Sequence, residues 1–319
     1  TVPASFASSS SSPPSLLRVV DAPWAYVKVS DGCDRRCSFC TIPAIRGPYR
    51  STPAPALVAE VEGLVAGGVH EIILIGQDTG IWAHDLDTCP SPSPHNLAQL
   101  LDTLAVCFPH TWFRVMYLQP QGVTGELLAT MAAHPNICRY LDIPLQHASA
   151  RILRAMNRAG SGQDYLARIR TIREALPGVT LRTSLIAGFP GETREDAREL
   201  EHFVDDAQLD YAGVFVYSRE DGTPAGECAN QVPLRTRRAR AQRLRDRADV
   251  AGFARAAAQV GSEAEVLVCG VDDEGPWGRT KGQAPEVDGV THLDTGVPGS
   301  VVRARIVQAS CYELYAEAL

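Results

Sequence analysis

The order of apolar and polar positions along the chain predicts short strands that alternate with amphipathic helices. Runs rich in β-branched and aromatic side chains fit six strands, at residues 26–29, 71–75, 112–118, 140–145, 180–186 and 211–217. Between them, apolar residues recur at helical spacing in residues 54–66, 97–107, 124–133, 163–175 and 194–207. Six strand–helix units predict an α/β fold with a parallel sheet, open or partly closed into a barrel, whose ligands bind at the carboxyl ends of the strands.

The pattern changes in the last third of the chain. Residues 234–260 are rich in Arg and Ala and predict one long helix, and beyond it four short runs fit strands, at residues 263–269, 277–281, 301–308 and 314–318. Gly and Pro separate these runs, as in a small all-β barrel. We therefore expect four segments: a disordered Ser/Pro-rich lead-in (1–23), an α/β core (24–232), a linking helix (233–260) and an all-β domain (261–319).

The composition is that of an ordinary globular protein, with 45% apolar and 21% charged residues. No run of about eighteen apolar residues occurs, so we expect no membrane span. The net charge of −7 gives no overall basic footprint for nucleic acid. Nine irregularly spaced cysteines do not fit a disulfide framework, and residues 1–14 lack the blocks of a signal peptide, so a cytoplasmic location is expected.

Three of the cysteines, Cys33, Cys37 and Cys40, lie in one short loop directly after the first predicted strand. Three thiolates from such a loop bind three irons of a [4Fe–4S] cluster and leave the fourth iron open for chemistry. A zinc site would need a fourth ligand from elsewhere, since the nearest histidine is His70. Three unrelated core cysteines would not be expected to gather in a loop with three charged residues. The spacing therefore favours an iron–sulfur site.

Polar or glycine-rich segments follow three of the other predicted strands. The first begins with Gly76 and Gln77, the second contains Gln146, and the third runs from Gly188 to Glu192. Glycines let a ligand approach the backbone, and free N–H groups there bind a carboxylate or a ribose oxygen. Together these segments predict a cofactor site at the carboxyl edge of the sheet.

Several side chains near these segments have two interpretations. Arg182, in the fifth predicted strand, pairs either with the carboxylate of a cofactor or with a carboxylate of the barrel itself. His147 is either a general base or a hydrogen-bonded structural histidine. Thr193 and Asp196 fit a helix N-cap, in which case part of the glycine-rich segment serves capping.

The C-x3-C-x2-C spacing after the first strand, with aromatic Phe39 before the last cysteine, resembles the radical S-adenosylmethionine (SAM) superfamily. The resemblance implies a partial (β/α)6 barrel, in agreement with the six units above. It also implies that SAM binds the open iron and is cleaved to methionine and a 5′-deoxyadenosyl radical, which takes a hydrogen atom from an unactivated carbon. The residues expected to contact the cofactor are Phe39, Gly76, Gln77, Gln146, Arg182, Gly188 and Glu192, with no catalytic residue beyond the cluster ligands.

Further segments are similar to the methylthiotransferase branch of this superfamily, at residues 41–47, 74–78, 144–147 and 188–192. The small all-β domain stands where that branch carries its TRAM domain. Residues 278–280 and 284–289 are similar to the RimO family, which methylthiolates the β-carbon of an aspartate in the small-subunit ribosomal protein number twelve. The alternatives are a tRNA (adenosine) methylthiotransferase and a non-catalytic iron–sulfur or TRAM binding fragment.

The charge distribution bears on the partner. Residues 261–319 carry ten acidic and four basic residues, a net charge of −6, which would attract a basic ribosomal protein; solvated turn charges are the alternative. The linking helix instead carries a strip of seven arginines: Arg235, Arg237, Arg238, Arg240, Arg243, Arg245 and Arg247. This strip fits contact with ribosomal RNA, or a solvated helix face with local acidic partners. A radical reaction also implies a one-electron donor.

One departure from the methylthiotransferase pattern concerns a second cluster. The resemblance implies an additional N-terminal domain with three cysteines for a second [4Fe–4S] cluster, implicated in sulfur delivery. No cysteine precedes Cys33 in this sequence. We therefore expect this chain to hold one cluster and to form the radical, but not to complete sulfur insertion on its own.

Overall fold

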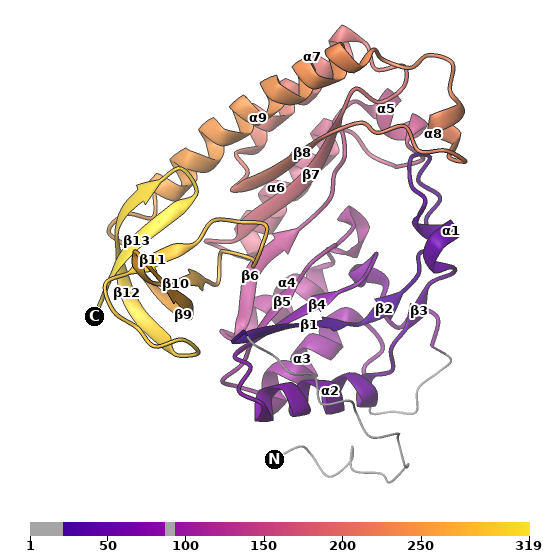
Figure 1. Cartoon of the computed structure of the whole chain (residues 1–319). Helices are drawn as coiled ribbons and strands as arrows, with labels where there is room; N and C mark the ends of the chain where they lie inside the picture. Colours follow the sequence, from indigo (N-terminus) through magenta and orange to yellow (C-terminus); the bar gives the residue numbers. More distant parts are fainter. Residues whose placement is uncertain (1–21, 87–92) are drawn as a thin grey trace.

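The computed structural model describes residues 22–86 and 93–319. The lead-in that was predicted to be disordered, residues 1–23, lies outside the described residues except for its last two. Figure 1 shows two bodies joined by one long helix, a sheet with helices packed on it and a small barrel at the C-terminal end. Within the described ranges, no helix has both the length and the apolar character needed to cross a membrane.

The larger body is a six-stranded sheet in the order β1-β4-β5-β6-β7-β8. Its strands are Trp24–Lys28 (β1), Glu71–Ile75 (β4), Trp112–Val115 (β5), Ile137–Asp142 (β6), Thr180–Ala187 (β7) and Tyr211–Val216 (β8). Each strand pairs in parallel with the next one, and β1 and β8 are the edges, so the sheet is open, as in a partial barrel. The predicted α/β fold is confirmed.

Helices connect the strands and pack on the sheet (Figure 1). The five predicted ones are Ala54–Ala66 (α2), Leu97–Cys107 (α3), Gly125–Ala133 (α4), Gly162–Ala175 (α6) and Arg194–Ala207 (α7). Their ends agree with the prediction within one residue, and Thr193 and Asp196 form a capping box, as one interpretation required. Three short helices were not predicted, because they contain too few residues to show an apolar period: Ile42–Arg46 (α1), Ala150–Ala155 (α5) and Pro224–Glu227 (α8).

Two strands of the sheet differ from the prediction by three residues at one or both ends, and the other differences in the sheet are of one or two residues. β5 stops at Val115, three residues before its predicted end, and Tyr117 has a left-handed backbone (φ 61°) that is incompatible with a strand. β6 begins three residues earlier than predicted and ends at Asp142. Ile143 and Leu145 are buried but belong to a loop. An apolar run alone does not distinguish a buried loop from a buried strand.

The smaller body is a closed barrel of five strands in the order β10-β11-β13-β12-β9. Its strands are Glu263–Asp272 (β9), Gly275–Thr280 (β10), Thr291–Leu293 (β11), Val301–Ser310 (β12) and Glu313–Ala318 (β13). The prediction of a small all-β barrel is confirmed, although β11, with three residues, was missed. The long helix Leu234–Ala257 (α9) ends three residues earlier than predicted and leads into this barrel.

The long helix α9 lies along the edge strand β8 (Figure 1). Arg245 Nη2 donates to the carbonyl oxygen of Val214 at 2.9 Å, and Arg237 Nη1 donates to that of Tyr217 at 3.0 Å. Two carbonyl groups at the edge of the sheet are therefore occupied by arginines of α9.

The small barrel packs against the sheet of the larger body. Ile73 and Tyr140 of the sheet share an apolar cluster with Leu267 and Ala284 of the smaller body. The small barrel thus buries part of the face of the sheet that carries Ile73 and Tyr140.

A buried group of three charges crosses the same boundary. Glu71 pairs with Arg114 Nε at 2.7 Å and with Arg279 Nη2 at 2.6 Å, and none of the three side chains is more than 2% exposed. Burial alone would raise the pKa of Glu71, but the two guanidinium groups outweigh it and lower the pKa. Because Arg279 belongs to β10, this charged group ties the two bodies together.

Candidate cluster and cofactor site

The cysteine loop leaves the sheet directly after β1. Two short strands, Ser30–Asp31 (β2) and Arg50–Ser51 (β3), pair antiparallel and close the base of the loop. Gly32 follows β2 with a left-handed backbone (φ 70°), and a Cβ there would lie 2.0 Å from the carbonyl oxygen of Pro48. Only glycine fits this position, so the turn that presents the cysteines depends on it.

The thiols of Cys33, Cys37 and Cys40 are free and partly buried. Burial is the main cause that raises the pKa of the Cys33 and Cys40 thiols, and the nearby Cys37 sulfur raises both further. A bound cation would reverse this and favour the thiolates.

The donor set fits a cluster better than one ion. The part of the chain that the structure describes contains no group of three or more His, Cys, Asp or Glu side chains placed to hold a metal ion. In a cubane cluster each cysteine binds a different iron, so three thiols of one loop need not converge on one point. Their assignment as cluster ligands stays a prediction.

The far side of the loop docks on the segment that follows α5. Ser38 N donates to the carbonyl oxygen of Met156 at 3.1 Å. Phe39 packs beside an apolar cluster that includes Phe189 and Tyr217. These contacts join the loop, which follows β1, to the segments that follow α5, β7 and β8. The contact of Phe39 with a cofactor stays a prediction.

The segment after β4 lies against the base of the same loop. A Cβ at Gly76 would lie 2.5 Å from Ser30 Oγ, which explains the glycine, and Gln77 beside it is exposed. Arg35 Nε pairs with Asp78 Oδ2 at 2.5 Å, and the Asp78 side chain is fully buried. Burial raises the pKa of Asp78, although Arg35 acts against it. This pair was not predicted from the sequence; it joins the cysteine loop to the segment after β4.

The glycine-rich segment after β7 is built around Glu192. Its Oε2 accepts hydrogen bonds from Gly188 N at 2.6 Å and from Phe189 N at 3.2 Å, and its Oε1 accepts one from Arg240 Nη1 at 2.8 Å. The expectation that the N–H group of Gly188 is free for a ligand is therefore wrong, because the tight turn brings the Glu192 carboxylate back onto its own backbone. Any direct contact of this segment with a cofactor stays a prediction.

His147 lies behind the same carboxylate and is fully buried. Ser149 N donates to His147 Nδ1 at 3.0 Å, and Nε2 lies 3.5 Å from Glu192 Oε2. These contacts favour the structural interpretation over a general base. The preceding Gln146 is partly buried and has a left-handed backbone (φ 71°), which is uncommon for a non-glycine residue.

Arg182 pairs with carboxylates of the protein, the second of its two interpretations. Its Nη1 lies 2.9 Å from Asp142 Oδ1, and its Nε lies 3.4 Å from Asp288 Oδ1. Asp288 comes from the segment after β10 and also accepts a hydrogen bond from Tyr140 Oη at 2.6 Å. Arg182 therefore contributes to the boundary between the two bodies.

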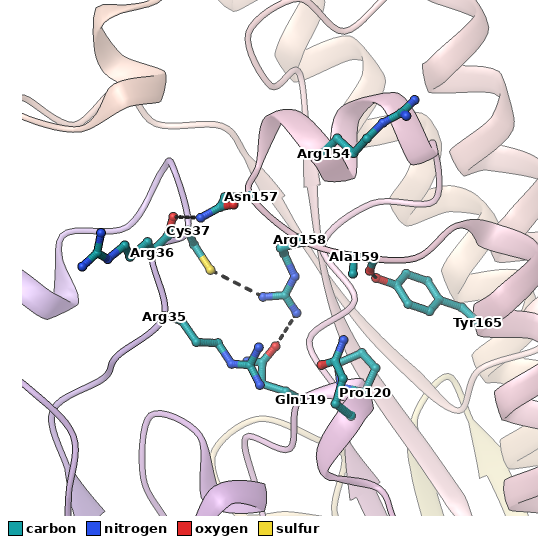
Figure 2. Close-up of a pocket in the computed structure, with 11 residues that line it drawn as sticks. Arg35, Arg36, Cys37, Gln119, Pro120, Arg154, Asn157, Arg158, Ala159 and Tyr165 are labelled. Carbon is teal, nitrogen blue, oxygen red and sulfur yellow. Dashed lines mark hydrogen bonds between the residues drawn. The ribbon is translucent and has the colours of Figure 1, made fainter.

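A pocket of about 470 Å³ opens beside Cys37 (Figure 2). Four of its lining residues are arginines: Arg35, Arg36, Arg154 and Arg158. Arg158 lies between Cys37 and Gln119, with Nη1 3.8 Å from Cys37 Sγ and with Nη2 donating to Gln119 Oε1 and to the carbonyl oxygen of Pro144, the latter at 2.6 Å. The sequence did not point to Arg158, because its position depends on the unpredicted helix α5.

The basic strip of α9 lies mostly against the larger body. Three of its arginines pair with carboxylates there: Arg240 with Glu192, Arg243 with Glu201 and Arg247 with Asp205. Arg235 and Arg238 are exposed. For the three paired arginines, the interpretation as a helix face with local acidic partners is confirmed.

Two family models match the chain. The model described as Radical SAM superfamily matches residues 27–204, and the model described as TRAM domain matches residues 260–319. The first match runs from β1 into α7 and leaves out β8, and the second covers the small barrel.

Curated relatives share the name ribosomal protein uS12 methylthiotransferase RimO. The relative from Trichlorobacter lovleyi is 43% identical over 299 residues, which cover 92% of this chain and 66% of that protein. The relative from Desulforudis audaxviator is 45% identical, with 92% and 65% covered, and that from Geobacter sulfurreducens is 42% identical, with 95% and 68% covered. The chain thus spans about two thirds of the length of these relatives.

Solved structures share the fold at low sequence identity. The radical S-adenosylmethionine methyltransferase TsrM from Kitasatospora setae aligns with a TM-score of 0.52 at 21% identity, over 64% of this chain and 38% of that one. The coproporphyrinogen III oxidase HemN from Escherichia coli aligns with a TM-score of 0.51 at 14% identity, over 90% and 67%. At these identities the likeness concerns the fold.

Proposed function

The chain belongs to the radical SAM superfamily and, within it, to the RimO family of ribosomal protein uS12 methylthiotransferases, and from this premise we propose that it acts in the methylthiolation of uS12. The name of the relatives supports uS12, the small-subunit ribosomal protein number twelve, as the substrate. The residue that is modified is, by the family resemblance, an aspartate at its β-carbon.

One observation carries this proposal: the three-cysteine loop leaves β1 at the carboxyl edge of a partial parallel barrel, where such folds bind their ligands. We propose Cys33, Cys37 and Cys40 as ligands of a [4Fe–4S] cluster, with SAM as the second cofactor. When bound, they supply one-electron cleavage of SAM and a 5′-deoxyadenosyl radical that removes a hydrogen atom from the target carbon. The electron comes from a separate one-electron donor.

The residues of the chain position and enclose this site. The Arg35–Asp78 pair joins the cysteine loop to the segment after β4, and Phe39 joins it to the apolar cluster of Phe189 and Tyr217, so both contacts help to position the thiols. Gly76 lets the backbone after β4 approach the loop closely. A rigid site of this kind keeps the reacting groups close together, which is the main contribution a protein makes to radical chemistry.

The acidic residues of the TRAM domain support its contact with uS12. Some of them are buried or already paired, so the surface available for this contact is smaller than the net charge of −6 implies. Asp288 is buried at the boundary of the two bodies, and Glu263 pairs with Arg303 and Arg305. Exposed carboxylates remain at the turn between β9 and β10: Asp272, Asp273 and Glu274. This turn is complementary to a basic protein.

We also propose a separate role for each of three segments of the chain. Residues 24–232 form the radical, residues 233–260 link the two bodies, and residues 261–319 contact the partner. By the family resemblance, sulfur insertion uses a second cluster.

Anaerobic reconstitution tests the cluster. We expect about four irons per chain and formation of 5′-deoxyadenosine in the presence of dithionite, with both lost in Cys37→Ala. Cys107→Ala is the matched control, since Cys107 lies in α3 on a partly buried face away from the loop and is expected to keep both. Zinc in place of iron, or no SAM cleavage, would overturn the proposal.

A deuterium experiment tests the substrate. With uS12 deuterated at its aspartate β-carbons, we expect deuterium in the 5′-deoxyadenosine product. Transfer from deuterated tRNA instead of uS12 would favour the tRNA methylthiotransferase and refute uS12 as the substrate.

A further inference from the structure

A second pocket, of about 600 Å³, lies at the boundary of the two bodies, and none of its lining residues belongs to the cysteine loop. Four segments meet around it, where α9 approaches the small barrel (Figure 1): β8, α9, the segment after β10 and the turn between β12 and β13. Residues 287–289, part of the segment that resembles the RimO family, line it. Binding sites are common at boundaries of this kind.

Two tyrosines form an aromatic wall of this boundary pocket. The rings of Tyr211 in β8 and Tyr312 in the turn after β12 lie 5.4 Å apart, and Phe253 of α9 packs edge-on against Tyr312. A Cβ at Gly252 would lie 2.3 Å from the ring of Tyr312, so α9 carries no side chain where this ring sits. Glycine inside a helix lowers its stability. The position of Tyr312 is therefore set by close packing against β8 and α9.

Three carboxylates line the same pocket: Asp249, Asp288 and Glu313. Asp249 accepts a hydrogen bond from Tyr312 Oη at 2.9 Å. The Asp288 side chain is fully buried, and its Oδ1 accepts no hydrogen bond from any residue that the structure describes. Burial raises the pKa of both Tyr211 and Tyr312, and the charge of Asp288 raises it further, so the field of this carboxylate reaches both rings.

The cations near the boundary pocket do not cancel these charges. Arg182 pairs with Asp142, a carboxylate outside the lining, and Arg245 donates to a carbonyl group of β8. Glu313 lies 3.3 Å from His292. Even when this histidine is protonated, the three lining carboxylates and Asp142 exceed the three cations by one charge. The pocket therefore favours a positively charged ligand.

We propose that the boundary pocket binds a lysine or arginine side chain of uS12. The inference rests on the proposed function, in which a basic ribosomal protein is the substrate. It adds a second contact with uS12 to the acidic turn between β9 and β10. The carboxylates and the faces of the two tyrosine rings both attract a cation, and the rings also accept the apolar stem of such a side chain.

The boundary pocket is separate from the cysteine loop. β8 runs from Tyr211, which lines the pocket, to Val216 at its carboxyl end. At about 3.3 Å per residue, these two residues lie about 16 Å apart. Phe39 of the cysteine loop packs against the apolar cluster that includes Tyr217, directly after Val216. A side chain held in the pocket therefore anchors uS12 about five residues of extended chain away from the proposed cluster ligands.

The alternative explanation is that the pocket is only a gap between the two bodies and that Asp249 serves to hold Tyr312. Asp249→Asn separates the two explanations, because asparagine keeps an oxygen that accepts from Tyr312 Oη and loses only the charge. Asp246→Asn is the matched control, since Asp246 is an exposed carboxylate of α9 that does not line the pocket. Both variants change the net charge equally, so a difference between them does not come from long-range attraction.

Equilibrium binding of uS12 to the anaerobically reconstituted chain tests the proposal. We expect Asp249→Asn to weaken binding about tenfold, and this difference from the parent should shrink at about 0.5 M salt. Asp246→Asn should bind uS12 as the parent does. Tyr211→Leu should weaken binding about twofold to fivefold, whereas Tyr211→Phe, which keeps the ring, should not.

Circular dichroism and iron content show whether each variant is folded and loaded. Equal affinities of Asp249→Asn and the parent, or equal losses in Asp249→Asn and Asp246→Asn, would overturn the proposal. A parent chain that does not bind uS12 would overturn the proposed substrate together with it. A parent that binds uS12, with pocket variants that have no effect, would overturn the pocket alone and leave the proposed function standing.

Discussion

Two glycines allow close backbone contacts around the cysteine loop, because a side chain at either position would collide with a neighbouring atom. At Gly32 a Cβ would meet the Pro48 carbonyl group, and at Gly76 it would meet Ser30 Oγ. Backbone cannot move aside as a flexible side chain can, so Gly32 is the more demanding of the two positions. The geometry of the proposed cluster ligands thus depends on a residue that binds nothing.

Gly32→Ala is therefore expected to abolish cluster assembly. The left-handed backbone and the 2.0 Å approach to Pro48 force the loop to rearrange, and the three thiols lose their arrangement. Iron content after reconstitution measures this effect. Gly63→Ala is the control: Gly63 lies in α2 with open space at its Cβ, so alanine should raise the free energy of unfolding by about 0.5–1 kcal/mol and leave iron unchanged. Full iron content in Gly32→Ala would contradict this account.

Asp196 makes the stability of the folded state depend on pH. It accepts hydrogen bonds from Ser149 Oγ at 2.7 Å and Thr193 N at 2.8 Å, and it pairs with Arg151. Burial acts in the opposite direction, but these bonds outweigh it and hold the pKa of Asp196 well below its ordinary value. A carboxyl group with a lowered pKa in the folded state stabilises the fold above its unfolded pKa of about 3.9, and the stabilisation is lost as the pH falls below it.

Asp196→Asn should remove this stabilisation. At pH 7 we expect the free energy of unfolding to fall by about 1–3 kcal/mol, because a charged, partly buried acceptor is replaced. The difference between variant and parent should shrink as the pH is lowered from about 4 to 2. Urea unfolding at several pH values measures both. A difference that is constant over this range would show that the charge of Asp196 is not the cause.

From the sequence, we could predict only those parts of the site that a characteristic spacing of one residue type marks. The cysteine spacing and the glycines after β4 and β7 were recognisable, whereas Asp78 and Arg158 were not. A guanidinium comes to lie beside the Cys37 sulfur only because α5 and the loop after it fold back on the cysteine loop. Such a contact joins residues 121 positions apart, and no local pattern encodes it.

At the scale of secondary structure, α9 shows how a basic strip can be structural. Some of its arginines pair with carboxylates of the larger body, and others donate to the carbonyl groups of Val214 in β8 and of Tyr217 directly after it. Arg240 is 12% exposed and its partner Glu192 is 1% exposed, so this pair is almost without solvent. Arg238, on the same helix, is exposed.

Charge reversal separates the two kinds of arginine. Arg240→Glu places a second carboxylate beside Glu192 and is expected to lower the free energy of unfolding by about 3–5 kcal/mol, as for a broken buried ion pair. Arg238→Glu should leave stability within about 0.5 kcal/mol of the parent. Thermal unfolding of both variants checks the contrast. Equal effects would mean that α9 does not lie on the larger body as described.

Helices were easier to predict than strands, for a physical reason visible in β5 and β6. The helix α3 shows a clear apolar period and an N-cap in which Asn96 accepts from Gln99 N, and both ends were predicted correctly. The ends of β5 and β6 are set by where neighbouring backbones stop pairing, as at Tyr117. Burial continues past those points into loops, so hydrophobicity does not mark them.

At the scale of the whole molecule, the two bodies are joined by charge as well as by apolar contact. Glu71 and Arg114 belong to the sheet, Arg279 belongs to the small barrel, and all three are buried. Removing one member leaves an incompletely compensated charge in the interior. The net charge of the small barrel gave no hint of this, because the contact depends on how the two bodies dock.

Arg279→Ala is expected to lower the free energy of unfolding by about 3–5 kcal/mol. The loss of one of its two cations also raises the pKa of Glu71, so the variant should lose further stability as the pH rises through that value. Urea unfolding at pH 5 and pH 8 measures both effects. Arg303→Ala, which removes a 72% exposed arginine, is the control and should show neither. A parent-like Arg279→Ala would mean that the two bodies do not share this charge group.

The two arginines of α9 that donate to the carbonyl groups of Val214 in β8 and of Tyr217 directly after it also bear on how the chain avoids aggregation. A parallel sheet that does not close offers the backbone of its last strand to any other chain, and such an edge is a template for amyloid-like growth. Phe215 on this strand is 55% exposed, which adds an apolar attraction. A piece of the protein that ends before residue 234 would keep every strand of the larger body and lose the cover of its edge. Precipitation of such a piece would therefore be a property of one uncovered strand, and adding α9 back as a separate peptide should restore its solubility.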